Sequence, residues 1–335
     1  MSMRAVVLTE PGGIEKLAHV ELPVPAIASP TSVRVRLHAA GLNPVDYKMR
    51  RNGSFAAAGE QPILGCDGAG VVEAIGSAVT HFHTGDAVYF CNGGYGLLPG
   101  TYAQYAVVDE AHLARKPATL DFAAAAAVPL ALITAWEALR MHVSFRPGAR
   151  VLVHAGAGGV GHIGIQLARI AGATAITTVS TDAKDRFARD LGATETIRYR
   201  DIDFVAAARD VSGGDGVDVV FDTVGGETFE RSVEAVRPYG DLVTCVAAEL
   251  SPTAAKIARN RNERIGYVWM PAPQVLNWPA ARRHQTEILV QGARLIDEGA
   301  LRVVVGASYT LDTIADAHTM LESGTTLGKI VLVIP

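Results

Sequence analysis

Three glycines in the stretch "VLVHAGAGGVGHIGIQLARIAGA" (residues 151–173) have the spacing G-x-G-x-x-G. An apolar β-type segment precedes them and a helical pattern follows, which is the context in which this spacing holds a dinucleotide pyrophosphate. The glycines permit a tight turn and a close approach of the backbone, and the helix N-terminus offers unpaired N–H groups. We therefore expect a nucleotide to bind at a loop made of Gly156, Gly158, Gly159, Val160 and Gly161.

The end of the following strand, "TAITTVSTDAK", indicates which dinucleotide binds. Ser180 ends that strand, Lys184 follows one helical turn later, and Tyr199 ends the next strand. Hydroxyls and a cation at these places suit an adenosine 2′-phosphate, so we favour NADP(H). Two alternatives stay open. Asp182 could bind a ribose hydroxyl, and Ser180 could be a helix N-cap with Lys184 on a solvated helix face.

Polar side chains also gather in "GLNPVDYKMRRNG", where Asn43 and Lys48 are candidate hydrogen-bond donors to a substrate oxygen. Asn43 could instead form a turn before Pro44, and Lys48 could be one of several solvated cations in "KMRR". The loop after the strand "VDVVFD" contains Val224 and Gly225 and is expected near the adenine or ribose. An apolar substrate cleft could be lined by three further residues, although such residues are more often core or interface: Tyr95, Trp269 and Met270.

Metal binding is not expected. The cysteines Cys66, Cys91 and Cys245 are few and scattered, which fits neither a disulfide framework nor a closed zinc site. His81 and His83 have the spacing H-x-H but lack an evident third ligand, so a solvated pair near a turn is the better interpretation.

The elements that must position these residues fall into two parts of the chain with different sequence patterns. Residues 3–117 contain short alternating β-type runs separated by Gly/Pro turns, which indicates a mostly antiparallel β domain. From about residue 121, helical segments alternate with β-type segments in the rhythm of a doubly wound parallel sheet. We expect an α/β protein whose six parallel strands cover 150–155, 174–180, 195–199, 217–223, 240–246 and 264–269.

The chain is long enough for two packed cores, with 335 residues, 49% hydrophobic and 19% charged. Its net charge of −4 and the lack of a basic cluster argue against a nucleic-acid partner. No leader pattern and no apolar run of about 18 residues is found, so we expect no membrane partner and a cytoplasmic protein. The expected domains are 1–122 and 123–270, with 271–335 completing the first.

Several motifs in order resemble the medium-chain dehydrogenase/reductase superfamily, and its zinc-free quinone oxidoreductases, which include zeta-crystallin, are the most similar branch. They are "GLNPVDYK", "PILGCDGAGVVEAIGS", "TYAQYAVV", "LITAWEAL", "AGAGGVG" and "LGKIVLVI". The resemblance implies a GroES-like β domain followed by a Rossmann domain, with the active site in the cleft between them. It also implies that Ser180, Lys184 and Tyr199 hold the 2′-phosphate and that Thr134 hydrogen-bonds the cofactor. A homodimer through strand 264–269 is expected as well.

The resemblance has two informative departures. Zinc-dependent members place a Cys at Asn43, a His-Glu pair at Cys66 and Asp67, and a further Cys in the stretch matching "VPLAL", so the catalytic zinc is expected to be absent. The zeta-crystallin-like pattern has a Tyr five residues after the Asn, where this chain has Lys48 preceded by Tyr47. "NPVDYK" is similar to the "NPVDFK" of plant alkenal and ene-one reductases, in which the Lys lies beside the cofactor ribose and the substrate.

Without zinc, hydride delivery to an already electrophilic acceptor is the chemistry we expect. The sequence therefore predicts an NADPH-dependent, zinc-free oxidoreductase of small-molecule enones or quinones, with Asn43, Tyr47 and Lys48 as the candidate catalytic residues. Two alternatives stay open: a one-electron quinone reductase, and a non-catalytic NADPH-binding protein with a structural or sensing role.

Overall fold

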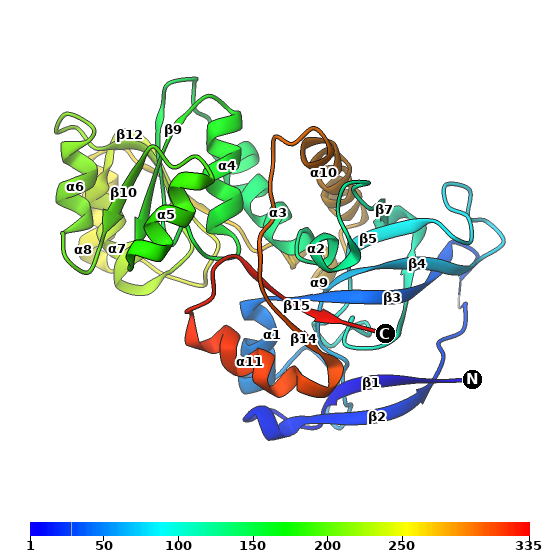
Figure 1. Ribbon diagram of the computed structural model, residues 1–335. Helices are drawn as coiled ribbons and strands as arrows, with labels where there is room; N and C mark the ends of the chain where they lie inside the picture. The colour runs from blue at the N-terminus through cyan, green and yellow to red at the C-terminus, as the bar shows by residue number, and fades with distance from the viewer. Residues whose placement is uncertain (28) are drawn as a thin grey trace. The chain divides into compact units, whose positions relative to one another are not determined.

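A computed structural model describes residues 1–27 and 29–335 of the chain, which form two compact units. The first unit consists of 1–130, 271–299 and 303–335, and the second of 131–270 with 300–302. Figure 1 shows the elements of each unit. Among the described residues, no helix is long and apolar enough to cross a membrane.

The first unit contains a seven-stranded sheet, with the order β14-β15-β3-β4-β5-β7 and β6 paired to β3. Neighbouring strands are antiparallel except for β14 and β15, which are parallel. The alternating run "SVRVRL" in β3 buries every second side chain, as expected for a strand with one face on the core. The strands are β3 (Ser32–Leu42), β4 (Asp67–Ile75), β5 (Ala87–Cys91), β6 (Tyr105–Asp109), β7 (Ala114–Arg115), β14 (Val305–Thr310) and β15 (Lys329–Val333).

A separate hairpin and several helices complete this unit. The antiparallel pair β1 (Ser2–Leu8) and β2 (Leu17–Pro23) contributes Val6 and Leu8 to the same apolar core. Short 3-10 turns are η1 (Ile14–Lys16), η2 (Glu110–His112) and η4 (Leu311–Thr313). The α-helices are α1 (Pro44–Asn52), α2 (Phe122–Ala126), α9 (Ala272–Val275), α10 (Pro279–Asp297) and α11 (Ile314–Ser323).

The second unit is built on a six-stranded sheet with the order β10-β9-β8-β11-β12-β13. All of its strand pairs are parallel, which confirms the predicted doubly wound sheet. Five of the six strands begin at their predicted first residue and end within two residues of their predicted last residue, with the outer strand β13 stopping at Tyr267. The exception is β12, which begins four residues earlier than predicted. The strands are β8 (Arg150–Val153), β9 (Thr174–Val179), β10 (Glu195–Arg198), β11 (Val217–Asp222), β12 (Val236–Thr244) and β13 (Arg264–Tyr267).

Helices cover both faces of this sheet. Helices α6, α7 and α8 share one apolar cluster with the strands, whereas α4 and α5 touch each other through His162 and Phe187. Helix α3 (Pro129–Trp136), whose first two residues belong to the first unit, continues into a π-helical segment η3 (Glu137–His142). The other helices are α4 (Gly161–Ile170), α5 (Asp182–Asp190), α6 (Phe204–Asp210), α7 (Gly226–Ala235) and α8 (Pro252–Asn260).

Candidate functional site

The glycine-rich loop connects β8 to α4, and two of its glycines are required by packing. A Cβ on Gly156 would lie 2.0 Å from Thr177 Oγ1, and one on Gly161 would lie 2.3 Å from the Ala155 carbonyl oxygen. A Cβ on Gly158 would meet only that same oxygen, at 3.2 Å. The space beside Gly158 is therefore open, which is what the approach of a pyrophosphate requires.

The start of this loop is fixed by hydrogen bonds to the neighbouring strand. Ala155 has a left-handed backbone with φ 51°, and its N–H donates to Thr178 Oγ1 at 2.9 Å. Beside it the ring of His154 is hydrogen-bonded to Thr178 Oγ1 at 3.2 Å and to Ser232 Oγ at 3.0 Å. Burial lowers the pKa of His154 to about 4, so its ring is neutral near pH 7. The loop is thus held in place by neutral groups before any ligand binds.

The predicted 2′-phosphate residues lie at the ends of β9 and β10, where Tyr199 N–H donates to the Val179 carbonyl. Ser180 and Lys184 are half-buried and Tyr199 is 48% exposed. The N-cap of α5 is Thr181, whose hydroxyl accepts the Lys184 N–H at 3.2 Å, and not Ser180. The Ser180 hydroxyl is therefore not used as the helix cap, and the N-cap alternative considered for it was wrong.

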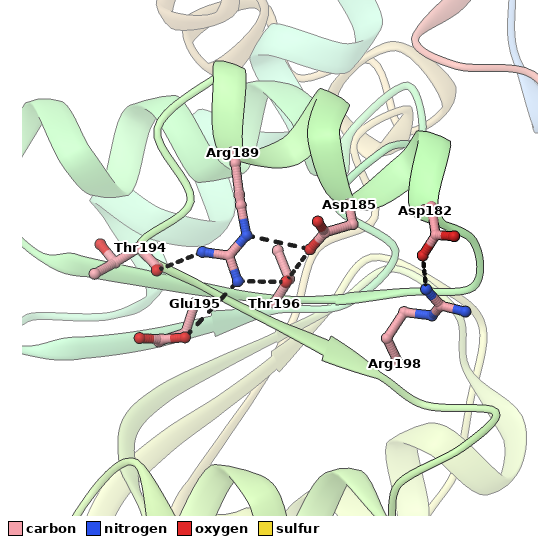
Figure 2. A network of polar contacts seen from close by, with 7 residues as sticks. All are labelled: Asp182, Asp185, Arg189, Thr194, Glu195, Thr196 and Arg198. Atoms are coloured by element: carbon pink, nitrogen blue, oxygen red, sulfur yellow. Dashed lines mark hydrogen bonds and ion pairs between the residues drawn. The ribbon is translucent and has the colours of Figure 1, made fainter.

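Ion pairs link α5 to β10 along the same edge of the sheet (Figure 2). Arg198 contacts the Asp182 carboxylate and also lies 3.3 Å from Asp201. Deeper in the network, Asp185 accepts from Arg189 and from Thr196. Because Arg198 compensates the charge of Asp182, this carboxylate repels a nearby phosphate less than an unpaired carboxylate would. Arg198 is a cation at this edge that the sequence analysis did not single out.

The loop after β11 is shaped by a buried carboxylate. Asp222 accepts the N–H groups of Val224 at 3.0 Å and of Gly225 at 3.0 and 3.1 Å, together with the Thr244 hydroxyl at 2.7 Å. Gly225 has φ 79° and is the N-cap of α7, while Val224 is exposed. The predicted cofactor residues of this loop therefore lie at the carboxyl end of the sheet, as the glycine-rich loop does.

Three further predicted residues belong to the second unit. Thr134 is buried on α3, and Met270 is buried just after the outer strand. Trp269 is 51% exposed. Of these, Trp269 has the accessible apolar surface that a substrate contact would need.

In the first unit Asn43 lies at the N-terminus of α1 inside a buried polar network. Its amide nitrogen donates to Asp67 Oδ2 at 2.9 Å and lies 3.8 Å from Cys66 Sγ. Its side-chain oxygen accepts from the Lys329 ammonium, and its backbone N–H donates to Asp46 Oδ2 at 2.8 Å. Both amide N–H groups are thus directed inside the unit, which favours the alternative that Asn43 organises the turn before Pro44.

Lys329 is the member of this network that the sequence analysis did not identify. It begins β15, is only 4% exposed, donates to the Leu42 carbonyl at 2.8 Å and lies 3.8 Å from Asp67 Oδ2. Asp67 also accepts the Leu130 N–H at 2.9 Å. Burial raises the pKa of Asp67, whereas the Lys329 charge and the Asn43 hydrogen bond lower it. The signal in the sequence was a single lysine in the otherwise apolar run "KIVLV".

The other two candidates on helix α1, Tyr47 and Lys48, are less buried than Asn43. Lys48 is exposed and Tyr47 is half-buried, whereas Asp46 and Arg50 on the same helix are buried. Asp46 accepts from the Tyr102 hydroxyl at 2.9 Å, and burial raises the pKa of Asp46 to about 7. Of the three candidate catalytic residues, Lys48 is therefore the most exposed and Asn43 the most buried.

Two of the three cysteines lie together, contrary to the expectation that they are scattered. Cys66 Sγ, Cys91 Sγ and a carboxylate oxygen of Asp67 all lie within 4.8 Å of one another. Tyr95 is buried beside Cys66 and does not line an open surface. His81 and His83 are exposed in the turn between β4 and β5, and Cys245 lies in the other unit.

The ligand positions of the zinc-dependent relatives do not suit a catalytic zinc here. The side-chain oxygen of Asn43, which would have to face the metal, already accepts a hydrogen bond from the Lys329 ammonium. The stretch "VPLAL" supplies no side chain with a nitrogen, sulfur or carboxylate ligand. A catalytic zinc site needs three protein ligands and an open position. The described residues at these positions do not provide that set.

Comparisons with known proteins agree with this architecture. Residues 29–118 match the alcohol dehydrogenase GroES-like domain, and residues 191–332 match the zinc-binding dehydrogenase family. The chain is 35% identical to a quinone oxidoreductase of Pseudomonas aeruginosa, with 96% of each protein covered. It is 33% identical to a 2-haloacrylate reductase of a Burkholderia species, with 98% of each covered.

A solved structure shows the same fold. The quinone oxidoreductase of Escherichia coli complexed with NADPH superimposes with a TM-score of 0.86 at 29% identity, covering 98% of this chain and 99% of that one. Together with the sequence relatives, this likeness shows the family. The chain is an oxidoreductase that belongs to the quinone oxidoreductase branch of the medium-chain dehydrogenase/reductase superfamily.

Proposed function

We propose that the protein is a zinc-independent reductase that uses NADPH to reduce an α,β-unsaturated carbonyl or a quinone. The observation that carries this proposal is the open space beside Gly158, in a loop otherwise fixed by packing and hydrogen bonds. The relatives named quinone oxidoreductase and 2-haloacrylate reductase support the acceptor class, because a quinone and a haloacrylate both present a C=C bond conjugated to C=O.

The cofactor is NADP(H), and when bound it supplies the hydride. Backbone N–H groups of residues 159–161, at the N-terminus of α4, receive the pyrophosphate. Ser180, Lys184 and Tyr199 receive the 2′-phosphate, with Arg198 as a further cation held by Asp182. Thr134 hydrogen-bonds the cofactor, and Val224 and Gly225 lie beside its adenine or ribose.

On the substrate side, Lys48 supports the negative charge that develops on the acceptor oxygen. Its ammonium is exposed and can donate to an enolate or hydroquinone oxygen, which is the step a Lewis acid would otherwise assist. Tyr47 is a second, half-buried donor on the same helix. Asn43 positions the start of α1 through Asp67 and Lys329, and Trp269 provides an apolar contact.

The first experiment measures NADPH oxidation with 9,10-phenanthrenequinone, 1,4-benzoquinone, 2-hexenal and 1-octen-3-one, with NADH in parallel and a chelator present. We expect turnover of enones with NADPH preferred, and a loss of about 10²–10⁴-fold in kcat/KM for Lys48→Met. Lys256→Met, an exposed lysine on α8, is the matched control and should be unaffected.

Other outcomes select the alternatives. Turnover of quinones alone, with Lys48→Met unaffected, assigns the quinone chemistry without a lysine donor. A semiquinone signal in electron paramagnetic resonance indicates one-electron reduction. Tight NADPH binding with no oxidation by any acceptor would leave the non-catalytic role.

We also propose a homodimer that pairs the outer strand β13 with its copy. This strand ends the six-stranded order and exposes Tyr267, so its free edge is available for pairing. Light scattering should give the mass of two chains, and Tyr267→Glu should give the mass of one. A single-chain mass for the unaltered protein would refute the dimer.

A further inference from the structure

We propose that Cys66, Cys91 and Asp67 form a binding site for one thiophilic divalent cation, such as Zn²⁺, separate from hydride transfer. Two thiol sulfurs and one carboxylate oxygen lie within 4.8 Å of one another in the first unit. Two sulfurs with one oxygen supply three of the four donors of a tetrahedral Zn²⁺ or Co²⁺ site. Cys66 and Asp67 stand at the positions of the His-Glu pair of the zinc-dependent relatives, but Cys91 on β5 takes the place of Asn43 and of "VPLAL" in the donor set.

The sheet brings these groups together. Asp67 and Cys91 are directly paired across the antiparallel strands β4 and β5, so their side chains share one face. Cys66 precedes the strand, where its carbonyl accepts the Asn92 N–H at 2.8 Å. The ligand atoms are therefore fixed by strand register and do not depend on a mobile loop.

The spacing suits a metal better than a disulfide. Sulfur ligands at roughly 2.3 Å from a tetrahedral metal lie roughly 3.8 Å apart, so the three atoms need to contract by about 1 Å at most. A disulfide would need the two sulfurs at about 2.05 Å, which requires a larger change in the paired strands.

A buried hydroxyl supports the deprotonated form that metal binding would create. Tyr95 is buried, and its hydroxyl faces the Cys66 thiol. With a cation bound, the Cys66 thiolate would accept a hydrogen bond from the Tyr95 hydroxyl.

The charges near the site compensate for one another. Two thiolates and Asp67 carry one more negative charge than a divalent ion neutralises, and the Lys329 ammonium lies 3.8 Å from Asp67. The buried Arg282 guanidinium lies near Cys91 and Tyr95 and donates to Asn92 Oδ1 at 2.7 Å. The positive charges of Lys329 and Arg282 stabilise thiolates in this buried site.

The test is a Co²⁺ titration of the reduced full-length protein under anaerobic conditions. We expect one equivalent to bind, with a thiolate-to-cobalt charge-transfer band and the visible bands of tetrahedral Co²⁺. Cys66→Ser and Cys91→Ser should each abolish the charge-transfer band or strongly reduce it, whereas Cys245→Ser should leave it unchanged. Absence of the band from the unaltered protein, or its survival in Cys91→Ser, would overturn the proposal.

Two further measurements keep folding and catalysis apart from binding. Far-ultraviolet circular dichroism shows whether each serine variant is folded, and Cys91→Ala provides a second variant at the half-buried position. Calorimetry in buffers of different ionisation enthalpy should show that Co²⁺ binding releases protons, as ligation by thiolates requires. NADPH oxidation is measured with a chelator present, so it tests the proposed reductase activity without the metal. The Co²⁺ titration tests the metal site without catalysis.

Discussion

Two polar networks, one in each unit, contain the same kinds of side chain in opposite surroundings. Around Asn43 in the first unit, Asp67 and Lys329 are almost fully removed from water. Between α5 and β10 in the second unit, the Asp182 carboxylate is 78% exposed, and the Asp185 and Arg189 side chains are partly exposed (Figure 2). Both networks contain carboxylate–cation contacts, but only the network around Asn43 is shielded from solvent.

The difference teaches which contacts the fold depends on. An exposed ion pair is screened by water and salt and contributes about 0–1 kcal/mol. A buried charge that loses its partner retains its full desolvation cost, so breaking a buried pair lowers the free energy of unfolding much more than breaking an exposed one. The network around Asn43 is therefore expected to be structurally necessary, and the one at α5 to be adjustable and available to a ligand.

Lys329→Met should give the largest effect. It removes the buried ammonium next to Asp67 and Asn43 and should lower the free energy of unfolding by about 3–5 kcal/mol. Urea denaturation followed by circular dichroism measures this. In Lys329→Met/Asp67→Asn both charges are gone, so part of the stability should return. A loss below about 1 kcal/mol in the single variant would contradict the comparison.

Acid titration should reveal a second buried group of the first unit. His318 is buried against Tyr102, both of its ring nitrogens lack partners among the described residues, and burial lowers its pKa to about 4. Between pH 6.5 and 4 the unfolded chain therefore binds a proton that the folded chain does not, so stability falls as pH falls. His318→Phe removes this dependence while keeping the ring packing.

The measurement compares urea midpoints of the two proteins at pH 7 and pH 4. The free-energy difference between wild type and His318→Phe should change by about 3 kcal/mol across this range, in the direction that favours the variant at low pH. Parallel stability curves for the two proteins would show that His318 does not titrate in this way.

Lys184→Met should change cofactor choice rather than stability. If the α5 network faces the 2′-phosphate, removing this ammonium should raise the KM for NADPH about tenfold, equivalent to about 1.4 kcal/mol. NADH lacks the 2′-phosphate and is the internal control, so its KM should stay constant. Equal effects on both cofactors would mean that Lys184 does not read the phosphate.

Arg189→Ala should have the smallest effect. Its guanidinium contacts Asp185, Thr194 and Thr196 at partly exposed positions, so the loss in unfolding free energy should stay below about 1 kcal/mol. Added salt should change the stability of the wild type by a similarly small amount. A loss as large as that of Lys329→Met would show that exposure does not separate the two networks.

The sequence predicted the nucleotide-type fold well because its signals are local. Gly156, Gly158 and Gly161 follow one strand directly and precede one helix, so their arrangement depends on neighbours in the chain. The prediction was least accurate at β12, which begins four residues before its predicted start. Hydrogen bonding within the sheet, rather than residue type alone, decides where a strand begins and ends.

The contacts around Asn43 depend on residues far apart in sequence, and local patterns could not give them. Lys329 lies 286 residues from Asn43, and Cys91 meets Cys66 only through the register of β4 with β5. The pairing of Asp182 with Arg198 likewise depends on how α5 lies against β10. In each case residue type was visible in the sequence, but the partner was set by tertiary packing.

The place of β15 in the first sheet has a consequence for synthesis on the ribosome. Residues 39–42 of β3 pair with β15, whereas the nearly contiguous unit of residues 131–270 is translated between them. A nascent chain can therefore complete most of its second unit while this part of β3 still has an unpaired edge. Because such edges invite association with other chains, chaperones that shield strand edges should engage the protein during that interval.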